Sequence, residues 1–136
     1  MLFRGEVDDA ELAREYAGCD VFCLPARYES FGLVLVEAMS HGKPVVACRA
    51  GGMPEVVADD RTGLLVEPDS LPALVAAIRQ LATDAGLRAT LGAAGRREYE
   101  DRFTVAAMVR GTLAAFAAAT AAEPATAGRR GLGLVA

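Results

Sequence analysis

The sequence predicts an α/β fold, in which a Rossmann-like parallel sheet is flanked by helices. Three short apolar segments, 21–24, 44–48 and 64–66, alternate with segments of helical period. Continuous apolar segments that stop at a proline or a turn are typical of strands buried on both faces. Because parallel sheets bind ligands at the carboxyl ends of their strands, the loops after Leu24 and Cys48 are the first places to search for a site.

Helices are expected between and after these strands. Asp8 and Asp9 can cap the first helix, which ends near Gly18, and Ser30 is the expected N-cap of a helix over residues 31–40. Apolar residues then recur at helical spacing from Leu71 onward. The remaining predicted elements are a strand stub at 2–4, a helical turn at 55–58, and helices at 71–81, 87–99 and 105–119.

Length and composition limit the domain organisation and the class of protein. The chain has 136 residues, enough for one domain with its own core. We expect residues 1–120 to form a partial domain and residues 121–136, rich in Ala, Gly and Arg, to be a disordered tail. The net charge of −4 argues against a nucleic-acid partner, which selects a basic surface. No apolar segment reaches the ~18 residues of a transmembrane helix.

The cysteine and histidine content bears on location and on metal binding. Three cysteines form no C-x-x-C pair, and their odd number suits reduced thiols in a cytoplasmic protein. The single histidine, His41, excludes a site with several histidine ligands. No basic region followed by an apolar stretch opens the chain in the manner of a signal peptide.

The start of the helix after Leu24 has the features of an anion site. If Ser30 is the N-cap, Phe31, Gly32 and Leu33 form the first turn, and their backbone N–H groups lack partners within the helix. The positive end of the helix dipole lies at the same place, which favours a phosphate. Gly32 carries no side chain, so an anion can approach the backbone closely.

Two carboxylates flank this turn. Glu29 precedes the helix, and Glu37 lies about 9 Å further along its axis, among residues so apolar that the helix is expected to be buried nearly all round. A carboxylate there needs partners, and a ribose diol would supply two hydroxyl donors. The simpler alternatives are that Glu29 is a solvated loop charge and that Glu37 faces solvent and pairs with Lys43.

Four sequence motifs follow one another along the chain. They are ESFGLVLVE, from Glu29 to Glu37, then AMSHGKPVVA, GGMPEVV and TGLLVEP. Together they closely resemble the C-terminal, donor-binding domain of the GT-B glycosyltransferases, specifically family 4, the glycosyl transferases group 1. The resemblance covers roughly residues 2–105.

The resemblance implies roles for both glutamates of the E-x7-E motif and for the turn between them. Glu29 matches the first Glu, which hydrogen-bonds hydroxyls of the transferred sugar, and Glu37 matches the second, which binds the ribose. The backbone amides of Phe31, Gly32 and Leu33 match the turn that holds the diphosphate. Ser30, Gly51 and Gly52 are further residues that could line the cleft; Gly51 and Gly52 match a family turn whose role is expected to be mainly structural.

The resemblance further implies that the chain is the C-terminal, donor half of a GT-B fold, incomplete at its N-terminal side. A whole enzyme of this family transfers a sugar from a UDP- or GDP-sugar to an acceptor, with retention of configuration and without an obligatory metal. The acceptor-binding N-terminal domain, which is the implied partner, matches no part of the chain. Neither does the Arg/Lys pair that neutralises the leaving diphosphate. We therefore expect little or no turnover by the isolated chain.

Two other functions remain open from the sequence. One is a non-catalytic Rossmann-like module, a gene remnant that binds nucleotide weakly or pairs with another chain. The other is a nucleotide-sugar epimerase of related architecture, against which the E-x7-E motif argues. Peripheral contact with a membrane also remains open.

Overall fold

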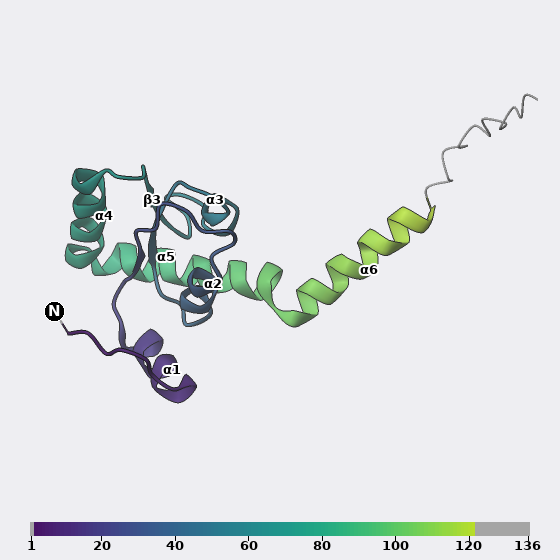
Figure 1. Cartoon of the computed structure of the whole chain (residues 1–136), viewed down its shortest axis with the longest axis horizontal. Helices are drawn as coiled ribbons and strands as arrows, with labels where there is room; N and C mark the ends of the chain where they lie inside the picture. The colour runs from purple at the N-terminus through teal and green to yellow at the C-terminus, as the bar shows by residue number, and fades with distance from the viewer. Residues whose placement is uncertain (1, 122–136) are drawn as a thin grey trace, which may run out of the picture. The chain divides into compact units, whose positions relative to one another are not determined.

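The computed structural model describes residues 2–121 (Figure 1). It contains a three-stranded parallel sheet in the order β1-β2-β3. The α/β fold expected from the alternation of strands and helices is confirmed. In chain order the elements are α1 (Asp9–Gly18), β1 (Phe22–Leu24), α2 (Leu33–Ser40), β2 (Val45–Cys48), α3 (Met53–Val56), β3 (Gly63–Val66), α4 (Leu71–Thr83), α5 (Ala85–Glu98), the π-helical turn η1 (Tyr99–Phe103) and α6 (Val105–Ala121).

The sheet is buried at its centre and open at one edge. Every residue of β2 is buried, as expected, whereas β1 is only half-buried, so the prediction that β1 is buried on both faces is wrong. Both β1 and β3 are edge strands of the described sheet, but α4 and α5 pack on β3, which is mostly buried, whereas α2 packs on β1. The strand stub predicted at residues 2–4 does not form, and Leu2 and Phe3 are exposed.

The helices cover the sheet with their apolar faces, and capping side chains mark where some of them begin. α2 packs on β1, β2 and α5, and α4 packs on β2 and β3. Asp8 is the N-cap of α1, as predicted, and its carboxylate accepts a hydrogen bond from the Glu11 amide at 2.7 Å. The largest fully buried side chains come from α2, α3, α4 and α5; they include Leu35, Met39, Met53, Leu81 and Leu91.

The start of α2 differs from the prediction. The helix begins at Leu33, not at Phe31, and its N-cap is Gly32 with φ +91°, not Ser30. A residue with a side chain rarely adopts the left-handed conformation found at Gly32, so glycine is favoured at this helix start. The helix is also not buried all round, because Leu33 and Glu37 are exposed on its outer side.

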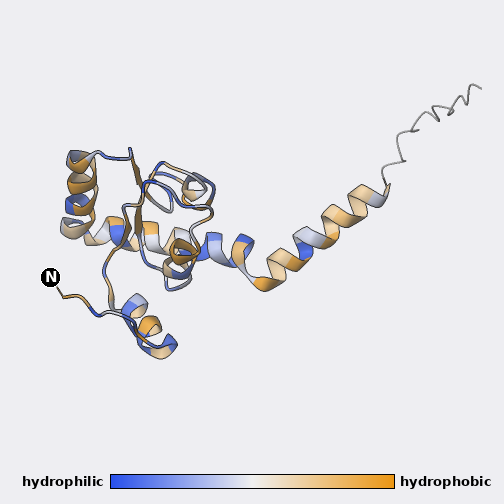
Figure 2. Cartoon of the chain, in the orientation of Figure 1, coloured by the Kyte–Doolittle hydropathy of each residue, from blue (hydrophilic) through white to orange (hydrophobic). Residues whose placement is uncertain are grey.

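The chain divides into two compact units, residues 1–104 and 105–136. In the second unit the structure describes only α6, whose side chains are mostly exposed and largely apolar (Figure 2). The tail predicted at 121–136 lies outside the described residues except for Ala121. Among residues 2–121 no single helix is long and apolar enough to span a membrane. The helical segments 85–103 and 105–121, which are separated by a bend, reach the required length and apolar composition together, by length and composition only.

α5 and the end of α2 approach each other closely at two glycines. Gly42, with φ +67°, turns the chain out of α2, and a Cβ at Gly92 of α5 would overlap the Gly42 carbonyl oxygen. Gly95, one turn further along α5, is buried, and a Cβ there would lie 3.3 Å from Met39 Cγ. The contact therefore depends on the absence of side chains on this face of α5.

We expect Gly92→Ala to destabilise residues 1–104 by about 1–3 kcal/mol, because backbone must move to admit the methyl group. Chemical denaturation followed by circular dichroism measures the change. Gly111→Ala is the matched control, since a Cβ at Gly111 of α6 meets nothing within 4 Å. Equal stability of Gly92→Ala and the unsubstituted chain would contradict the packing described.

Candidate functional site

The loop between β1 and α2 folds around the Glu29 carboxylate. Glu29 is half-buried, and its Oε1 accepts hydrogen bonds from the backbone amides of Phe31 and Gly32, both at 3.3 Å. These are two of the three amides that were predicted to form the anion site, and their partner lies outside the helix, in the side chain of Glu29. A negatively charged oxygen sits on them, so the loop is arranged to hold an anion.

The first amides of α2 itself remain available. Among the described residues no hydrogen-bond acceptor contacts the Leu33 or Val34 amide, since the helix pattern begins with Leu35 donating to the Gly32 carbonyl. Both amides lie in the first turn, where the helix dipole is positive. The start of α2 thus has two amides without a described acceptor, those of Leu33 and Val34. Beside them are two loop amides, those of Phe31 and Gly32, that donate to the Glu29 carboxylate.

Gly51 and Gly52 pack against the backbone of the loop that contains Glu29. The Gly52 amide donates to the Glu29 carbonyl at 2.8 Å. A Cβ on Gly51 would overlap that same carbonyl, and a Cβ on Gly52 would overlap the Ser30 carbonyl. Gly51 also has φ +54°. Gly51 and Gly52, which were candidates for lining the cleft, lie against the loop backbone, and the Ser30 side chain is exposed.

Phe31 is braced by a residue that the sequence analysis missed. Its ring meets Phe103 of η1 edge to face, with centroids 6.2 Å apart and planes at 76°. The Arg102 guanidinium lies 5.0 Å from the Phe103 ring centroid and donates to the Glu55 carbonyl at 3.3 Å. Phe103 is remote from the loop in sequence, so no local pattern could have indicated this contact.

Glu37 has one hydrogen-bond partner of a kind that the sequence analysis did not anticipate. The Tyr16 hydroxyl of α1 donates to Glu37 Oε2 at 2.7 Å. Burial, and then the hydrogen bond to Glu37, raise the pKa of Tyr16 above its ordinary value, so the hydroxyl stays protonated. The alternative in which Lys43 pairs with Glu37 is wrong, because Lys43 Nζ instead donates to the Ala17 carbonyl at 2.7 Å.

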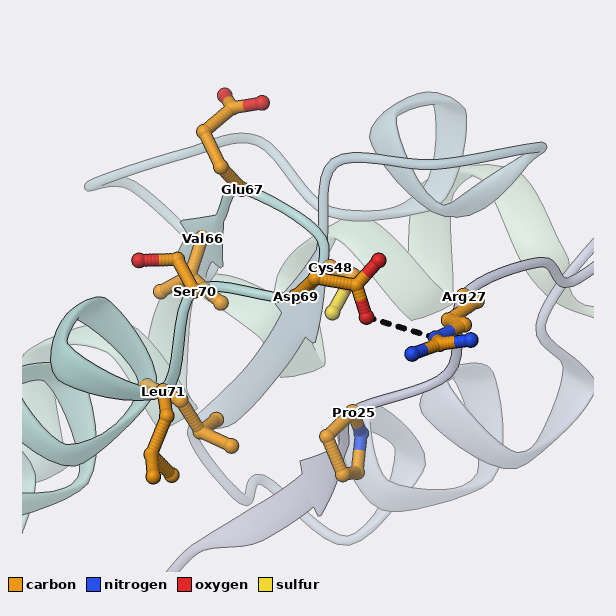
Figure 3. A pocket seen from close by; sticks show the side chains of 9 residues that line it. Pro25, Arg27, Cys48, Val66, Glu67, Asp69, Ser70 and Leu71 are labelled. Carbon is orange, nitrogen blue, oxygen red and sulfur yellow. Dashed lines mark hydrogen bonds and ion pairs between the residues drawn. The ribbon is translucent and has the colours of Figure 1, made fainter.

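A pocket of about 270 Å³ opens where the three strands end (Figure 3). Arg27 and Asp69 form an exposed ion pair across it, with 2.7 Å between Nε and Oδ1. Cys48 lines it too, and burial raises the pKa of that thiol. None of the predicted donor-binding residues lines this pocket. Among residues 2–121 no group of His, Cys, Asp and Glu side chains is arranged to hold a metal ion.

Comparison with known proteins identifies relatives of the chain. Residues 1–98 match the sequence profile of the family described as glycosyl transferases group 1. The sulfoquinovosyl transferase SQD2 of Arabidopsis thaliana is 42% identical over 102 residues, which are 73% of this chain and 20% of that protein.

Solved structures agree with the sequence match. Sucrose-phosphate synthase from Thermosynechococcus elongatus superimposes with a TM-score of 0.77 at 37% identity, over 88% of this chain and 30% of that chain. Anabaena HepE in complex with UDP-glucose superimposes with a TM-score of 0.69 at 32% identity, over 77% of this chain and 29% of that chain. The chain thus spans less than a third of each of these proteins. The neighbours have the GT-B fold, and the chain belongs to the glycosyl transferases group 1 family.

Proposed function

We propose that this chain is the donor-binding part of a retaining family 4 glycosyltransferase, the C-terminal half of a GT-B enzyme that uses a nucleotide diphosphate sugar. The observation that carries the proposal is the loop of Glu29, Phe31 and Gly32, whose amides hold an anionic oxygen beside the start of α2. The complex of the related HepE with UDP-glucose supports a donor of this kind.

The proposed roles are those that the resemblance to the E-x7-E motif implies, and the positions of the groups support them. The amides of Phe31, Gly32 and Leu33 bind the diphosphate, because together they form a cluster of N–H donors at a positive helix end. Glu37 binds the ribose through carboxylate oxygens on the exposed side of α2. Glu29 hydrogen-bonds the sugar hydroxyls from the loop that precedes the helix.

Binding of the donor requires a local exchange at Glu29. The carboxylate and a diphosphate oxygen compete for the amides of Phe31 and Gly32, and two like charges there would repel each other. The hydrogen bonds to Glu29 are long at 3.3 Å, so a diphosphate with several oxygens can replace them. The released carboxylate is then free to accept hydrogen bonds from the sugar.

The remaining parts of the proposal concern the whole enzyme. An acceptor-binding N-terminal domain is the partner, UDP- or GDP-sugar is the donor, no metal is obligatory, and the location is cytoplasmic. We propose that residues 1–136 alone are inactive, because no part of them matches the Arg/Lys pair that stabilises the leaving diphosphate. Release of free UDP from UDP-glucose by the purified chain would contradict this point.

We expect isothermal titration calorimetry to detect saturable binding of UDP-glucose or of a GDP-sugar to the purified chain. Glu37→Gln should weaken this binding by about 1.5–3 kcal/mol, since hydrogen bonds to a charged acceptor are lost. Glu100→Gln is the matched control, because among residues 2–121 the side chain of Glu100 pairs only with Arg96, at the exposed surface. Absence of binding at millimolar ligand would instead favour a non-catalytic remnant.

Glu29→Ala should separate the two parts of the donor. Because the competing carboxylate is gone, we expect UDP to bind at least as tightly as to the unsubstituted chain. Because the sugar contact is gone too, any preference for UDP-glucose over UDP should disappear. The same calorimetry measures both ligands. A variant that loses UDP affinity but keeps its preference for UDP-glucose would contradict the assignment of Glu29.

A further inference from the structure

Tyr16 connects α1 to the carboxylate proposed to bind ribose. It is the one residue of α1 that is buried, with 7% of its surface exposed, and its hydroxyl donates to Glu37 Oε2 at 2.7 Å. The two residues are 21 positions apart, so the contact is made by the fold and not by the local chain. No role in the site was assigned to Tyr16 by the sequence motifs.

The Tyr16 ring is fixed from two sides. It stacks on His41 with centroids 5.6 Å apart and planes at 14°, and it meets Phe22 of β1 at 5.5 Å. α1 is also tied to the loop after α2, because Lys43 Nζ donates to the Ala17 carbonyl. The hydroxyl is therefore held in place by packing before Glu37 contacts it.

The hydrogen bond restricts an otherwise free side chain. Glu37 is exposed, and an exposed glutamate on a helix samples several rotamers whose loss on binding opposes affinity. Tyr16 engages Oε2 only, and no described residue donates to Oε1. Because the phenol is neutral, it fixes the carboxylate without supplying a positive charge that would compete with a ligand's hydroxyl groups.

We propose that Tyr16 is a positioning residue, which orients Glu37 so that Oε1 is presented to the ribose diol of the nucleotide. This inference rests on the proposed function of Glu37. A purely structural role, in which the hydrogen bond only staples α1 to α2, is the competing explanation. The two differ in whether loss of the hydroxyl acts on ribose recognition or on binding in general.

The test compares UDP with 2′,3′-dideoxy-UDP on the purified chain and on Tyr16→Phe. The phenylalanine ring keeps the contacts with His41 and Phe22, so the variant removes the hydroxyl alone. We expect UDP to bind about threefold to tenfold more weakly to Tyr16→Phe, while dideoxy-UDP binds equally to both proteins. Tyr99→Phe is the matched control and should leave both affinities unchanged, since the Tyr99 ring lies against Arg96.

A double variant strengthens the test. If Tyr16 acts through Glu37, adding Tyr16→Phe to Glu37→Gln should cause no further loss of UDP affinity. Thermal unfolding of each variant shows whether the fold is intact.

Each other outcome overturns the proposal. Equal weakening of UDP and dideoxy-UDP by Tyr16→Phe would leave only the structural role, and unchanged binding of UDP would leave no role. If the unsubstituted chain prefers UDP to dideoxy-UDP while Tyr16→Phe keeps that preference, the positioning inference alone fails. If the unsubstituted chain binds no UDP at all, the proposed function fails and this inference fails with it.

Discussion

The candidate site depends on one arrangement of backbone, in which the Glu29 carboxylate is held by the Phe31 and Gly32 amides. The loop can lie there only because the next turn approaches it without side chains at Gly51 and Gly52. Gly32, which donates one of these hydrogen bonds, has the left-handed conformation and is the N-cap of α2. A cluster of amides that donates to a carboxylate has the donor groups that a diphosphate needs, since both groups present anionic oxygens.

The sequence predicts the fold well where local signals decide the structure. Asp8 caps α1, β2 is buried throughout, and the apolar period from Leu71 onward yields α4. The predictions are wrong where contacts with another segment of the chain determine the structure. Residues 2–4 pair with no described strand and are exposed. β1 is an edge strand on which α2 packs, and it is half-buried, whereas the other edge strand, β3, is covered by α4 and α5.

The site is predictable in its residues and less so in its geometry. The spacing of Glu29 and Glu37 is visible in the sequence, but their partners are not. Glu29 bonds to its own loop, which depends on a left-handed residue and not on a Ser30 cap, and Glu37 bonds to Tyr16, which belongs to another helix. The Tyr16–Glu37 contact joins segments remote in sequence, which periodicity and capping patterns do not report. The Glu29 contacts are local, but they depend on a loop conformation that differs from the expected Ser30 cap.

A crystal structure of the chain with UDP-glucose tests the central claim most directly. The account predicts diphosphate oxygens within hydrogen-bonding distance of the amides of Phe31, Gly32 or Leu33. It also predicts that the Glu29 carboxylate has moved from the loop amides to the sugar. A complex in which Glu29 keeps its present hydrogen bonds and the diphosphate lies elsewhere, for example in the pocket beside Arg27, would contradict it.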